Sequence, residues 1–399
     1  MKQKLRIVAD EAIPFLKGVL EPFAEMLYLP GNAISKKNVE NADALLVRTR
    51  TSCNAELLEN SSVKMIATAT IGTDHLDKSF LERKGIFYTN APACNADSVV
   101  QYFTAALLEM CARQKKDFRN LTLGIVGVGN IGSRILQVGK ILGMRVLCCD
   151  LPKQEQGNFD IGVSFKTICE ESDIITFHTP LTRTGLFPTY HMFNENTLSW
   201  VKKPFWLFNA SRGEVVSETA LKLAIESRAC SASVIDVFEN EPTIHKSFLE
   251  KISIATPHIA GYSLDGKANA TSQIVQQVAL FFDIPELKTF NVELQETDKK
   301  WVIDFKETNT LVGQIQKVYR LSYDIKQDDF LLRNNPEQFE WFRKNYPKRR
   351  EPKAHKILIQ NFLPETKEIL EKLKNKNIQI EVDERLKERG ARLHQKYKN

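Results

Sequence analysis

The feature that most constrains the fold of this chain is a glycine pattern between two apolar stretches. The first stretch, Leu123–Val126, runs into Gly127-x-Gly129-x-x-Gly132 and an amphipathic segment, and the second stretch is Val146–Cys149. Between a strand and a helix, the first glycine permits a tight turn and the second lets a pyrophosphate approach the backbone. The third lets the helix pack closely on the strand. The pattern predicts a dinucleotide-binding βαβ unit.

The residue after the second apolar stretch indicates which dinucleotide is bound. Asp150 can accept hydrogen bonds from the adenosine ribose, and its negative charge repels a 2′-phosphate. The N-terminus of the intervening helix offers N–H groups and a partial positive charge to the pyrophosphate. The sequence therefore predicts NAD, rather than NADP, as the cofactor.

The composition excludes several other classes of protein. Hydrophobic residues make up 43% and charged residues 26% of the 399 residues, as in soluble enzymes of two or three domains. No apolar run approaches the roughly 20 residues that span a bilayer, and Asp10 and Glu11 interrupt the apolar N-terminus. The seven cysteines include no C-x-x-C pair. We expect a cytoplasmic protein with no membrane partner, no disulfide framework and no metal site.

The net charge of +6 is unevenly distributed along the chain. Residues 343–356 and the tail from Arg385 are strongly basic, but no nucleic-acid recognition motif accompanies them. We therefore expect no nucleic-acid partner and interpret the basic tail as a solvated segment. An alternative for these cations is that some of them attract an anionic substrate.

The pattern of apolar stretches predicts an α/β protein of three domains. Residues 1–95, completed by residues 263–288, are expected to form a discontinuous, flavodoxin-like substrate-binding domain. Residues 96–262 are expected to form a doubly wound parallel sheet of the Rossmann type that binds NAD. Residues 289–399 are expected to form a small α+β module with a basic tail, here called the C-terminal module.

Short apolar runs define the expected strands and longer periodic runs define the helices. The expected strands are Leu5–Ala9, Ala44–Arg48, Met65–Ala69, Ile86–Thr89, Leu123–Val126, Val146–Cys149, Asp173–His178, Phe205–Asn209, Ala232–Val237, Ile252–Thr256, Trp301–Phe305, Lys356–Gln360 and Ile378–Val382. The expected helices include Asp97–Arg113, Leu264–Phe282, Thr310–Tyr323 and Pro364–Lys374.

Three charged residues follow late strands of the expected NAD domain and suit the oxidation of a 2-hydroxy acid. His258 can take the hydroxyl proton, Glu241 can orient its ring, and Arg212 can hold a carboxylate in a bidentate fork. Each residue alone has a structural explanation, since a histidine after a strand, an arginine in a turn and a Glu-Pro pair are common. Their joint occurrence in this order favours a catalytic set.

The chain resembles the D-isomer-specific 2-hydroxyacid dehydrogenases. The general match consists of the Gly127 turn, His178-Thr179-Pro180, Arg212, Glu241 and His258. A narrower match to one branch of that family lies in residues 69–75, 90–96 and 258–268, and in the stretches 323–329 and 343–351. This narrower resemblance implies oxidation of a phosphorylated four-carbon 2-hydroxy acid with NAD in vitamin B6 synthesis.

The resemblance also implies roles for individual residues. It implies that substrate is contacted by Thr49, Thr70 and Tyr262. It implies that NAD is contacted by Gly127, Gly129, Gly132, Asp150, Thr179, Asp236 and Gly261, with backbone N–H groups of Asn130 and Ile131 at the pyrophosphate. We expect His75 to order the loop that holds Thr70 and His178 to orient its neighbours. The C-terminal module resembles a dimerisation domain, which implies a homodimer.

Two alternatives to this function stay open at the level of the sequence. The chain could be another member of the family, of the phosphoglycerate or hydroxypyruvate type, or a non-enzymatic NAD-sensing protein on the same fold. The ligands of the substrate phosphate are also open: the candidates are Arg48, Lys267 and the run Arg343–Arg350. For that run the simpler interpretation is a solvated surface.

Overall fold

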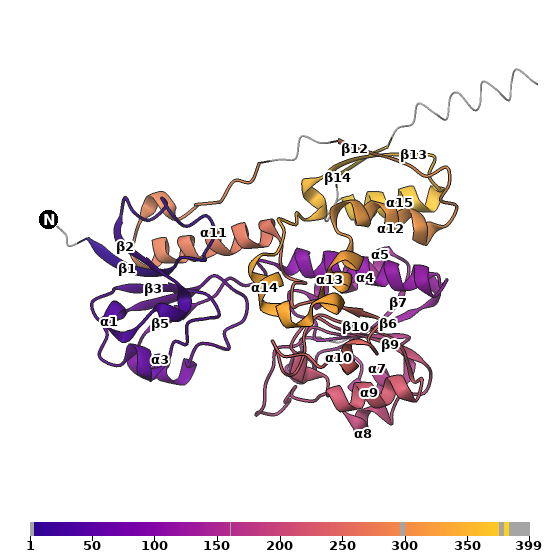
Figure 1. The fold of residues 1–399 in the computed structure, drawn as a ribbon, viewed down its shortest axis with the longest axis horizontal. Coiled ribbons are helices and arrows are strands. Elements are labelled where there is room, and N and C mark those ends of the chain that lie inside the picture. The colour runs from indigo at the N-terminus through magenta and orange to yellow at the C-terminus, as the bar shows by residue number, and fades with distance from the viewer. Residues whose placement is uncertain (1–3, 160, 296–299, 375–378, 383–399) are drawn as a thin grey trace, which may run out of the picture. The chain divides into compact units, whose positions relative to one another are not determined.

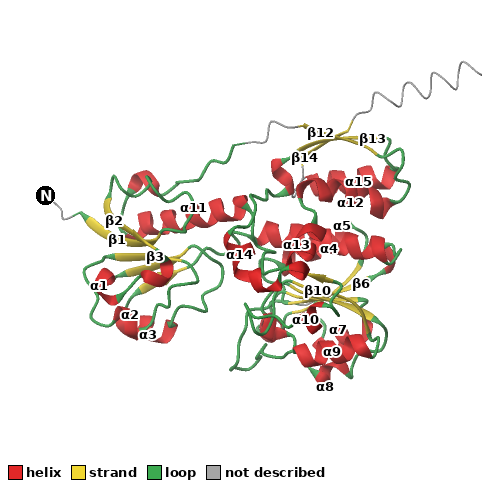
Figure 2. Cartoon of the chain, viewed as in Figure 1, coloured by secondary structure: helices red, strands yellow, loops and turns green. Residues whose placement is uncertain are grey.

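The computed structural model describes residues 4–159, 161–295, 300–374 and 379–382. The basic tail expected after Asp383 lies outside the described residues. The chain divides into two compact units: the first joins residues 1–95 with 263–295, and the second joins residues 96–262 with 296–399. Figure 1 labels their elements, and Figure 2 distinguishes helices from strands.

The first unit is built on a five-stranded parallel sheet in the order β2-β1-β3-β4-β5. Its strands are β1 (Leu5–Asp10), β2 (Ala24–Leu29), β3 (Ala44–Val47), β4 (Met65–Thr68) and β5 (Phe87–Thr89). Its helices are η1 (Gly31–Ala33), α1 (Lys36–Val39), α2 (Ala55–Leu58), α3 (Lys78–Lys84), α11 (Leu264–Phe281) and η4 (Pro285–Leu287). The long helix α11 packs on one face of the sheet, and α2 and α3 contribute to the core on the other face.

The NAD-type domain of the second unit contains a six-stranded parallel sheet in the order β11-β10-β9-β8-β6-β7. Its strands are β6 (Thr122–Val126), β7 (Arg145–Cys149), β8 (Ile174–Phe177), β9 (Phe205–Asn209), β10 (Cys230–Ile235) and β11 (Ile254–Ala255). Its helices are α4 (Ala96–Arg113), η2 (Phe118–Asn120), α5 (Gly132–Ile141), α6 (Leu151–Glu155), α7 (Phe165–Glu171), α8 (Glu195–Leu198), η3 (Gly213–Val215), α9 (Glu218–Glu226) and α10 (Lys246–Leu249).

Helices cover both faces of this sheet, as a doubly wound fold requires. Helices α4 and α5 lie on one face, and α7 and α9 lie on the other (Figure 1). Because both faces are covered, the central strands β6, β8 and β9 are buried along their whole length. The expectation of a doubly wound parallel sheet is confirmed.

The described part of the C-terminal module packs against the NAD-type domain. It contains β12 (Lys300–Asp304), α12 (Leu311–Ser322), α13 (Ile325–Asn334), η5 (Pro336–Gln338), α14 (Phe339–Lys344), η6 (Pro352–Ala354), β13 (Lys356–Gln360), α15 (Pro364–Lys374) and β14 (Gln379–Val382). The three strands pair in parallel in the order β12-β13-β14, a detail that the α+β expectation did not specify. Helices α12 and α15 lie between this sheet and helices α4 and α5 (Figure 1).

Helix α4 joins the two parts of the second unit. Fifteen of its 18 residues are buried, so both of its sides are covered. One continuous apolar cluster contains residues of α4, β6 and α5 together with residues of β12, α12, β13 and α15. The NAD-type domain and the C-terminal module therefore share a single core.

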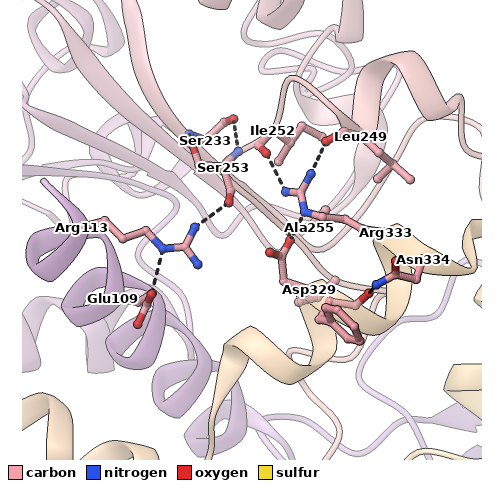
Figure 3. A network of polar contacts seen from close by, with 12 residues as sticks. Glu109, Arg113, Ser233, Leu249, Ile252, Ser253, Ala255, Asp329, Arg333 and Asn334 are labelled. Atoms are coloured by element: carbon pink, nitrogen blue, oxygen red, sulfur yellow. Dashed lines mark hydrogen bonds and ion pairs between the residues drawn. The ribbon is translucent and has the colours of Figure 1, made fainter.

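Polar contacts reinforce this junction. Arg333, on α13, donates to the carbonyl oxygens of Leu249 and Ile252 and bonds Asp329 through Nε (Figure 3). Asp329 in turn accepts a hydrogen bond of 2.7 Å from the Ala255 N–H, at the end of β11. Hydrogen bonds to charged groups contribute about 1.5–3 kcal/mol each to stability. This set therefore fastens α13 to the edge strand of the large sheet.

All seven cysteines are buried and none takes part in a disulfide. No helix in the described part of the chain has both the length and the apolar character needed to cross a membrane.

Candidate active site

The predicted site residues of the second unit lie on loops at one edge of its sheet. In a parallel sheet all carboxyl ends point to the same edge, which is where such folds bind ligands. Each strand of this sheet delivers part of the set. These parts are Gly127–Gly132 after β6, Asp150 after β7, Thr179 after β8, Arg212 after β9, Asp236 and Glu241 after β10, and His258, Gly261 and Tyr262 after β11.

The loop after β6, residues 127–132, is here called the Gly127 loop, and its glycines have different surroundings. A Cβ on Gly127, whose φ is +86°, would lie 2.8 Å from the carbonyl oxygen of His178. A Cβ on Gly132 would lie 2.0 Å from the carbonyl oxygen of Gly127. A Cβ on Gly129 would meet nothing within 4 Å. The protein itself thus requires the first and third glycines, whereas the second leaves an open space that fits the approach of a pyrophosphate.

Helix α5 continues from this loop and lacks a side-chain cap. Its N-cap residue, Ile131, is apolar and makes no side-chain capping hydrogen bond. The N-terminal N–H groups of a helix need partners, and an anion supplies them well. The predicted roles of the Asn130 and Ile131 N–H groups at the pyrophosphate therefore suit this geometry, and they stay predictions.

The Asp150 carboxylate is fixed by the loop that it faces. It accepts hydrogen bonds from the Val128 N–H at 2.8 Å and from the Lys153 N–H at 3.3 Å. The Lys153 ammonium donates to the Val128 carbonyl oxygen at 2.6 Å, so Lys153 and Asp150 both bond the backbone of Val128. The sequence reasoning missed Lys153, although its place in the helix that Asp150 caps was a usable signal.

The loop after β8 contributes a hydroxyl group and a neutral histidine. The Thr179 side chain lies against Gly127, and its Oγ1 atom is buried without a hydrogen-bond partner. A buried hydroxyl without a partner is unfavourable unless a ligand supplies one, which suits the predicted contact with NAD. His178 shares a 2.9 Å hydrogen bond between Nε2 and Thr176 Oγ1. Burial lowers the pKa of His178 to about 3, so this ring is uncharged near neutral pH.

His258 and Glu241 are brought together by the fold. The Nδ1 atom of His258 lies 2.7 Å from Oε2 of Glu241, and Oε1 of Glu241 accepts a 2.8 Å hydrogen bond from the Phe238 N–H. Because Nδ1 faces the carboxylate, Nε2 is the nitrogen that can exchange a proton with a substrate. The His258 side chain keeps 31% of its area exposed, so a small molecule can reach it.

Arg212 lies on the neighbouring loop, at the end of β9. Its Nη1 donates to the Ser211 carbonyl oxygen at 2.8 Å. The turn that follows is tight, because a Cβ on Gly213 would lie 2.1 Å from the carbonyl atoms of Phe238. The Arg212 turn therefore lies directly against the backbone segment that leads to Glu241.

Residues 256–262 follow β11 and are here called the His258 loop. His258 has a left-handed backbone with a φ of +55°, which is unusual for a residue other than glycine. Asp236 is buried, and it accepts hydrogen bonds from the Thr256 hydroxyl at 2.6 Å and from the N–H groups of Ile259 and Ala260 at 2.8 and 2.9 Å. Burial raises the pKa of Asp236. The structure thus directs Asp236 to the loop backbone, and its contact with NAD stays a prediction.

The remaining predicted substrate residues occupy both units. In the first unit Thr70 bonds Thr68 through their hydroxyls at 2.8 Å, and Thr68 contacts His75 Nε2 at 3.0 Å, so His75 and Thr70 belong to one network. Thr49 is exposed after β3. In the second unit, the guanidinium carbon of Arg343 lies over the ring of Tyr262, 5.9 Å from the ring centre.

The structure changes the interpretation of the basic run 343–350. Arg349 is only 6% exposed, so this part of the run is not a solvated surface. Arg343 is half-buried and pairs with Glu340 at 2.8 Å. The other two candidates belong to the first unit: Arg48 donates to the Ala12 carbonyl oxygen at 3.2 Å, and Lys267 lies on α11.

No three metal-ligating side chains gather anywhere in the described ranges of the chain. The absence of a metal from the working protein stays a prediction.

Comparison with known proteins places this geometry in a family. Residues 99–260 match the NAD binding domain of the D-isomer specific 2-hydroxyacid dehydrogenases. The erythronate-4-phosphate dehydrogenase of Bacteroides thetaiotaomicron is 42% identical over 356 residues, which cover 89% of this chain and 99% of the relative. That of Bacteroides fragilis is 41% identical over 358 residues, with coverages of 89% and 99%. This chain belongs to the erythronate-4-phosphate dehydrogenase family.

Solved structures agree with the family on the fold. The D-lactate dehydrogenase of Aquifex aeolicus, complexed with NAD and lactic acid, is 27% identical and superposes with a TM-score of 0.59. It covers 73% of this chain and 100% of its own length, so about a quarter of this chain has no counterpart there. Residues 299–373 match a family described only as a domain of unknown function. The predictions of an NAD-dependent 2-hydroxyacid dehydrogenase and of the erythronate-4-phosphate dehydrogenase resemblance are confirmed.

Proposed function

We propose that this chain oxidises 4-phospho-D-erythronate to 2-oxo-3-hydroxy-4-phosphobutanoate with NAD, a step of pyridoxal 5′-phosphate (vitamin B6) biosynthesis. The names of its relatives support the substrate. One observation carries the chemistry: the 2.7 Å hydrogen bond between His258 and Glu241 at the carboxyl edge of an NAD-binding sheet. A base that is oriented by a carboxylate and exposed beside a dinucleotide site is suited to alcohol oxidation.

Each residue of the catalytic set has one task in this proposal. His258 takes the proton of the C2 hydroxyl through Nε2, and Glu241 stabilises the resulting imidazolium. The bond between C2 and its hydrogen breaks, and bound NAD accepts the hydride while C2 and its oxygen form a carbonyl. Arg212 holds the substrate carboxylate in a bidentate fork, which keeps C2 in place during the transfer.

The test is a substrate panel with the purified protein, followed by NADH formation. It compares 4-phospho-D-erythronate with D-erythronate, 3-phosphoglycerate, glycerate and D-lactate at equal concentrations. We expect kcat/KM to be highest for 4-phospho-D-erythronate. A preference for 3-phosphoglycerate or glycerate would assign the chain to another branch of the family. NAD binding without oxidation of any of the five compounds would instead support an NAD-sensing role.

We also propose that the protein is a homodimer whose interface includes the C-terminal module. Phe330 on α13 and Trp341 on α14 are 65% and 58% exposed, and interfaces favour such aromatic residues. Phe339 is fully buried and packs on Phe238, so it belongs to the core instead. Light scattering should show a dimer that Phe330→Glu or Trp341→Glu weakens, whereas Leu186→Glu, at an exposed position of the NAD-type domain, leaves it intact. A dimer unaffected by all three variants would place the interface elsewhere.

We propose a cytoplasmic location for the protein. Seven buried cysteines without a disulfide fit a reducing compartment. Fractionation of cells that express the tagged protein tests this, and recovery in a secreted or membrane fraction would contradict it.

A further inference from the structure

One buried side chain of the C-terminal module, Arg349, hydrogen-bonds to the backbone of the His258 loop. Arg349 donates from Nη2 to the carbonyl oxygen of Ala260 at 2.6 Å and to that of Ile259 at 3.3 Å. These two residues directly follow His258 in the chain. The same two residues donate their N–H groups to Asp236. The backbone after His258 is therefore held on its N–H side by Asp236 and on its carbonyl side by Arg349.

The surroundings of Arg349 belong almost entirely to the C-terminal module. Its guanidinium lies 4.4 Å from the ring centre of Tyr323 and 5.7 Å from that of Tyr346. The hydroxyls of both tyrosines donate to one carboxylate oxygen of Asp328, at 2.9 and 2.7 Å. Aromatic faces and a nearby carboxylate compensate for burying a guanidinium. These contacts within the C-terminal module thus fix the position of the Arg349 guanidinium that bonds the His258 loop.

The backbone of His258 needs such support. A left-handed conformation in a residue other than glycine is unfavourable and persists only where the surrounding structure imposes it. In this chain the catalytic histidine itself has that conformation, with a φ of +55°. The hydrogen bonds of Asp236 to the N–H groups of Ile259 and Ala260, and of Arg349 to their carbonyl oxygens, can impose it, because they fix the orientation of the peptide groups that follow His258.

We propose that Arg349 is a positioning residue: it holds the His258 loop so that the imidazole keeps its place against Glu241. The module that matches a domain of unknown function is then part of the apparatus that orients the catalytic base, in addition to any role in assembly. This inference rests on the proposed function, because it takes His258 as the acid/base.

Arg333 provides a matched control within the same module. It also reaches from the C-terminal module to two carbonyl oxygens of the NAD-type domain, those of Leu249 and Ile252 (Figure 3). Those carbonyls precede β11, whereas the carbonyls bound by Arg349 follow it. Loss of either arginine weakens the junction, but only loss of Arg349 releases the backbone next to His258.

The experiment compares Arg349→Met and Arg349→Lys with Arg333→Met in the full-length protein. We expect Arg349→Met to lower kcat about 10- to 100-fold, the scale of a small misplacement of a catalytic group, while KM for NAD changes less than about threefold. Arg349→Lys keeps the charge but loses the planar double donor, so we expect a smaller loss. Arg333→Met should lower the melting temperature while its kcat stays within about twofold of the wild type.

A second measurement does not depend on turnover. Amide hydrogen exchange of the peptide that contains residues 256–262 should be faster in the Arg349 variants than in Arg333→Met. If Arg349→Met does not fold, Tyr346→Phe removes one hydrogen bond to Asp328 and should give the same pattern in smaller amplitude. Wild-type kcat and exchange in the folded Arg349 variants, or equal kcat losses in the Arg349 and Arg333 variants, would overturn the proposal. Failure of the proposed function would appear differently, as a wild-type protein that does not oxidise the substrate.

Discussion

The Gly127 loop and the His258 loop leave the same sheet at the same edge, yet they use their backbone groups in opposite ways. The Gly127 loop leads into a helix without a side-chain cap and keeps an open space at Gly129. In the His258 loop, N–H and carbonyl groups on both sides of the chain are bonded by Asp236 and Arg349. The first loop suits the predicted bonding of a ligand through its backbone, whereas the backbone of the second is bonded within the protein and holds His258 in place.

The difference separates two requirements of a dehydrogenase. A cofactor that must enter and leave is best bonded by groups that have no other partner in the protein. A proton-transfer group must keep its position to within about 0.5 Å, which favours a backbone whose N–H and carbonyl groups are hydrogen-bonded within the protein. Variants of the two loops should therefore fail in different ways: those of the Gly127 loop in cofactor binding, and those of the His258 loop in turnover.

The largest effect is expected at the fixed loop. His258→Ala should lower kcat by about 10²–10⁴-fold, because a positioned acid/base typically contributes that much. NADH binding, followed by fluorescence, should remain close to that of the wild type. A large loss of NADH affinity in this variant would break the comparison, since the two loops would then share one task.

A smaller effect is expected from the carboxylate that faces the open loop. Asp150→Ala should raise KM for NAD by about 10- to 100-fold, the equivalent of one or two lost charged hydrogen bonds. The ammonium of Lys153, which is bonded to Val128 in the same loop, is then no longer opposed by the Asp150 charge and should improve the use of NADP. Adding Lys153→Ala should remove that improvement. The ratio of kcat/KM for NAD and NADP checks this, and an unchanged ratio in Asp150→Ala would contradict the assignment.

The substrate phosphate offers a third test of the same contrast. Because the backbone of the His258 loop is already bonded, we expect a side-chain cation to bind the phosphate. Arg48→Gln, Lys267→Gln and Arg343→Gln should include a variant that raises KM for 4-phospho-D-erythronate about tenfold. The matched measurement uses D-erythronate, for which KM should change much less. Equal changes for both substrates in all three variants would show that none of these cations binds the phosphate.

The glycines of the open loop allow a sharper comparison within one motif. Gly129→Ala should keep or raise stability, by up to about 1 kcal/mol, because its Cβ meets no atom within 4 Å. It should weaken NAD binding several-fold. Gly132→Ala should lower stability by more than about 2 kcal/mol, since its Cβ meets the Gly127 carbonyl oxygen. Thermal unfolding without cofactor separates the two variants, and equal destabilisation would mean that the space at Gly129 serves the fold.

The last prediction, which concerns neither cofactor binding nor turnover, is a pH dependence of stability. His178 has a pKa of about 3 in the folded protein, below the ordinary value of 6.5. Below pH 6.5 the unfolded chain therefore binds a proton at this residue that the folded chain does not bind. The free energy of unfolding should decrease as the pH is lowered, by up to about 1.4 kcal/mol per pH unit between pH 6.5 and about 3. His178→Gln should reduce this slope in urea unfolding measured between pH 4 and 6.5. An identical slope in the variant would show that His178 titrates normally.

Local sequence patterns predicted most of the large sheet and the pairing of its site residues. The glycine turn, the buried strands and the polar residues at their ends are short-range signals, and the observed strands begin and end within about two residues of the expected positions. Strand β2 was not predicted, and neither were several helices, among them α7, α9, α13 and α14. The sequence of β2, AEMLYL, has neither a buried run nor a clean alternation, because it lies at the edge of its sheet.

The support of the His258 loop could not be predicted in the same way. Residues 323–329 and 343–351 were recognised as typical of one branch of the family, but nothing near Arg349 in the sequence indicates its partners. Arg349 and Ala260 are 89 positions apart, and their contact depends on how the C-terminal module packs on the large sheet. Burial of an arginine within a basic run is decided by tertiary structure, which a local charge pattern does not contain.

The shared core around α4 has a consequence for the order in which the protein is made. Arg113, the last residue of α4, leaves the ribosome 198 residues before Leu311, the first residue of α12 that covers it. At about 5–20 residues per second this interval lasts roughly 10–40 seconds. Throughout that time the apolar face of α4 that α12 covers has no partner in the nascent chain. Newly made chains of this protein should therefore depend on chaperones until the last hundred residues have been synthesised.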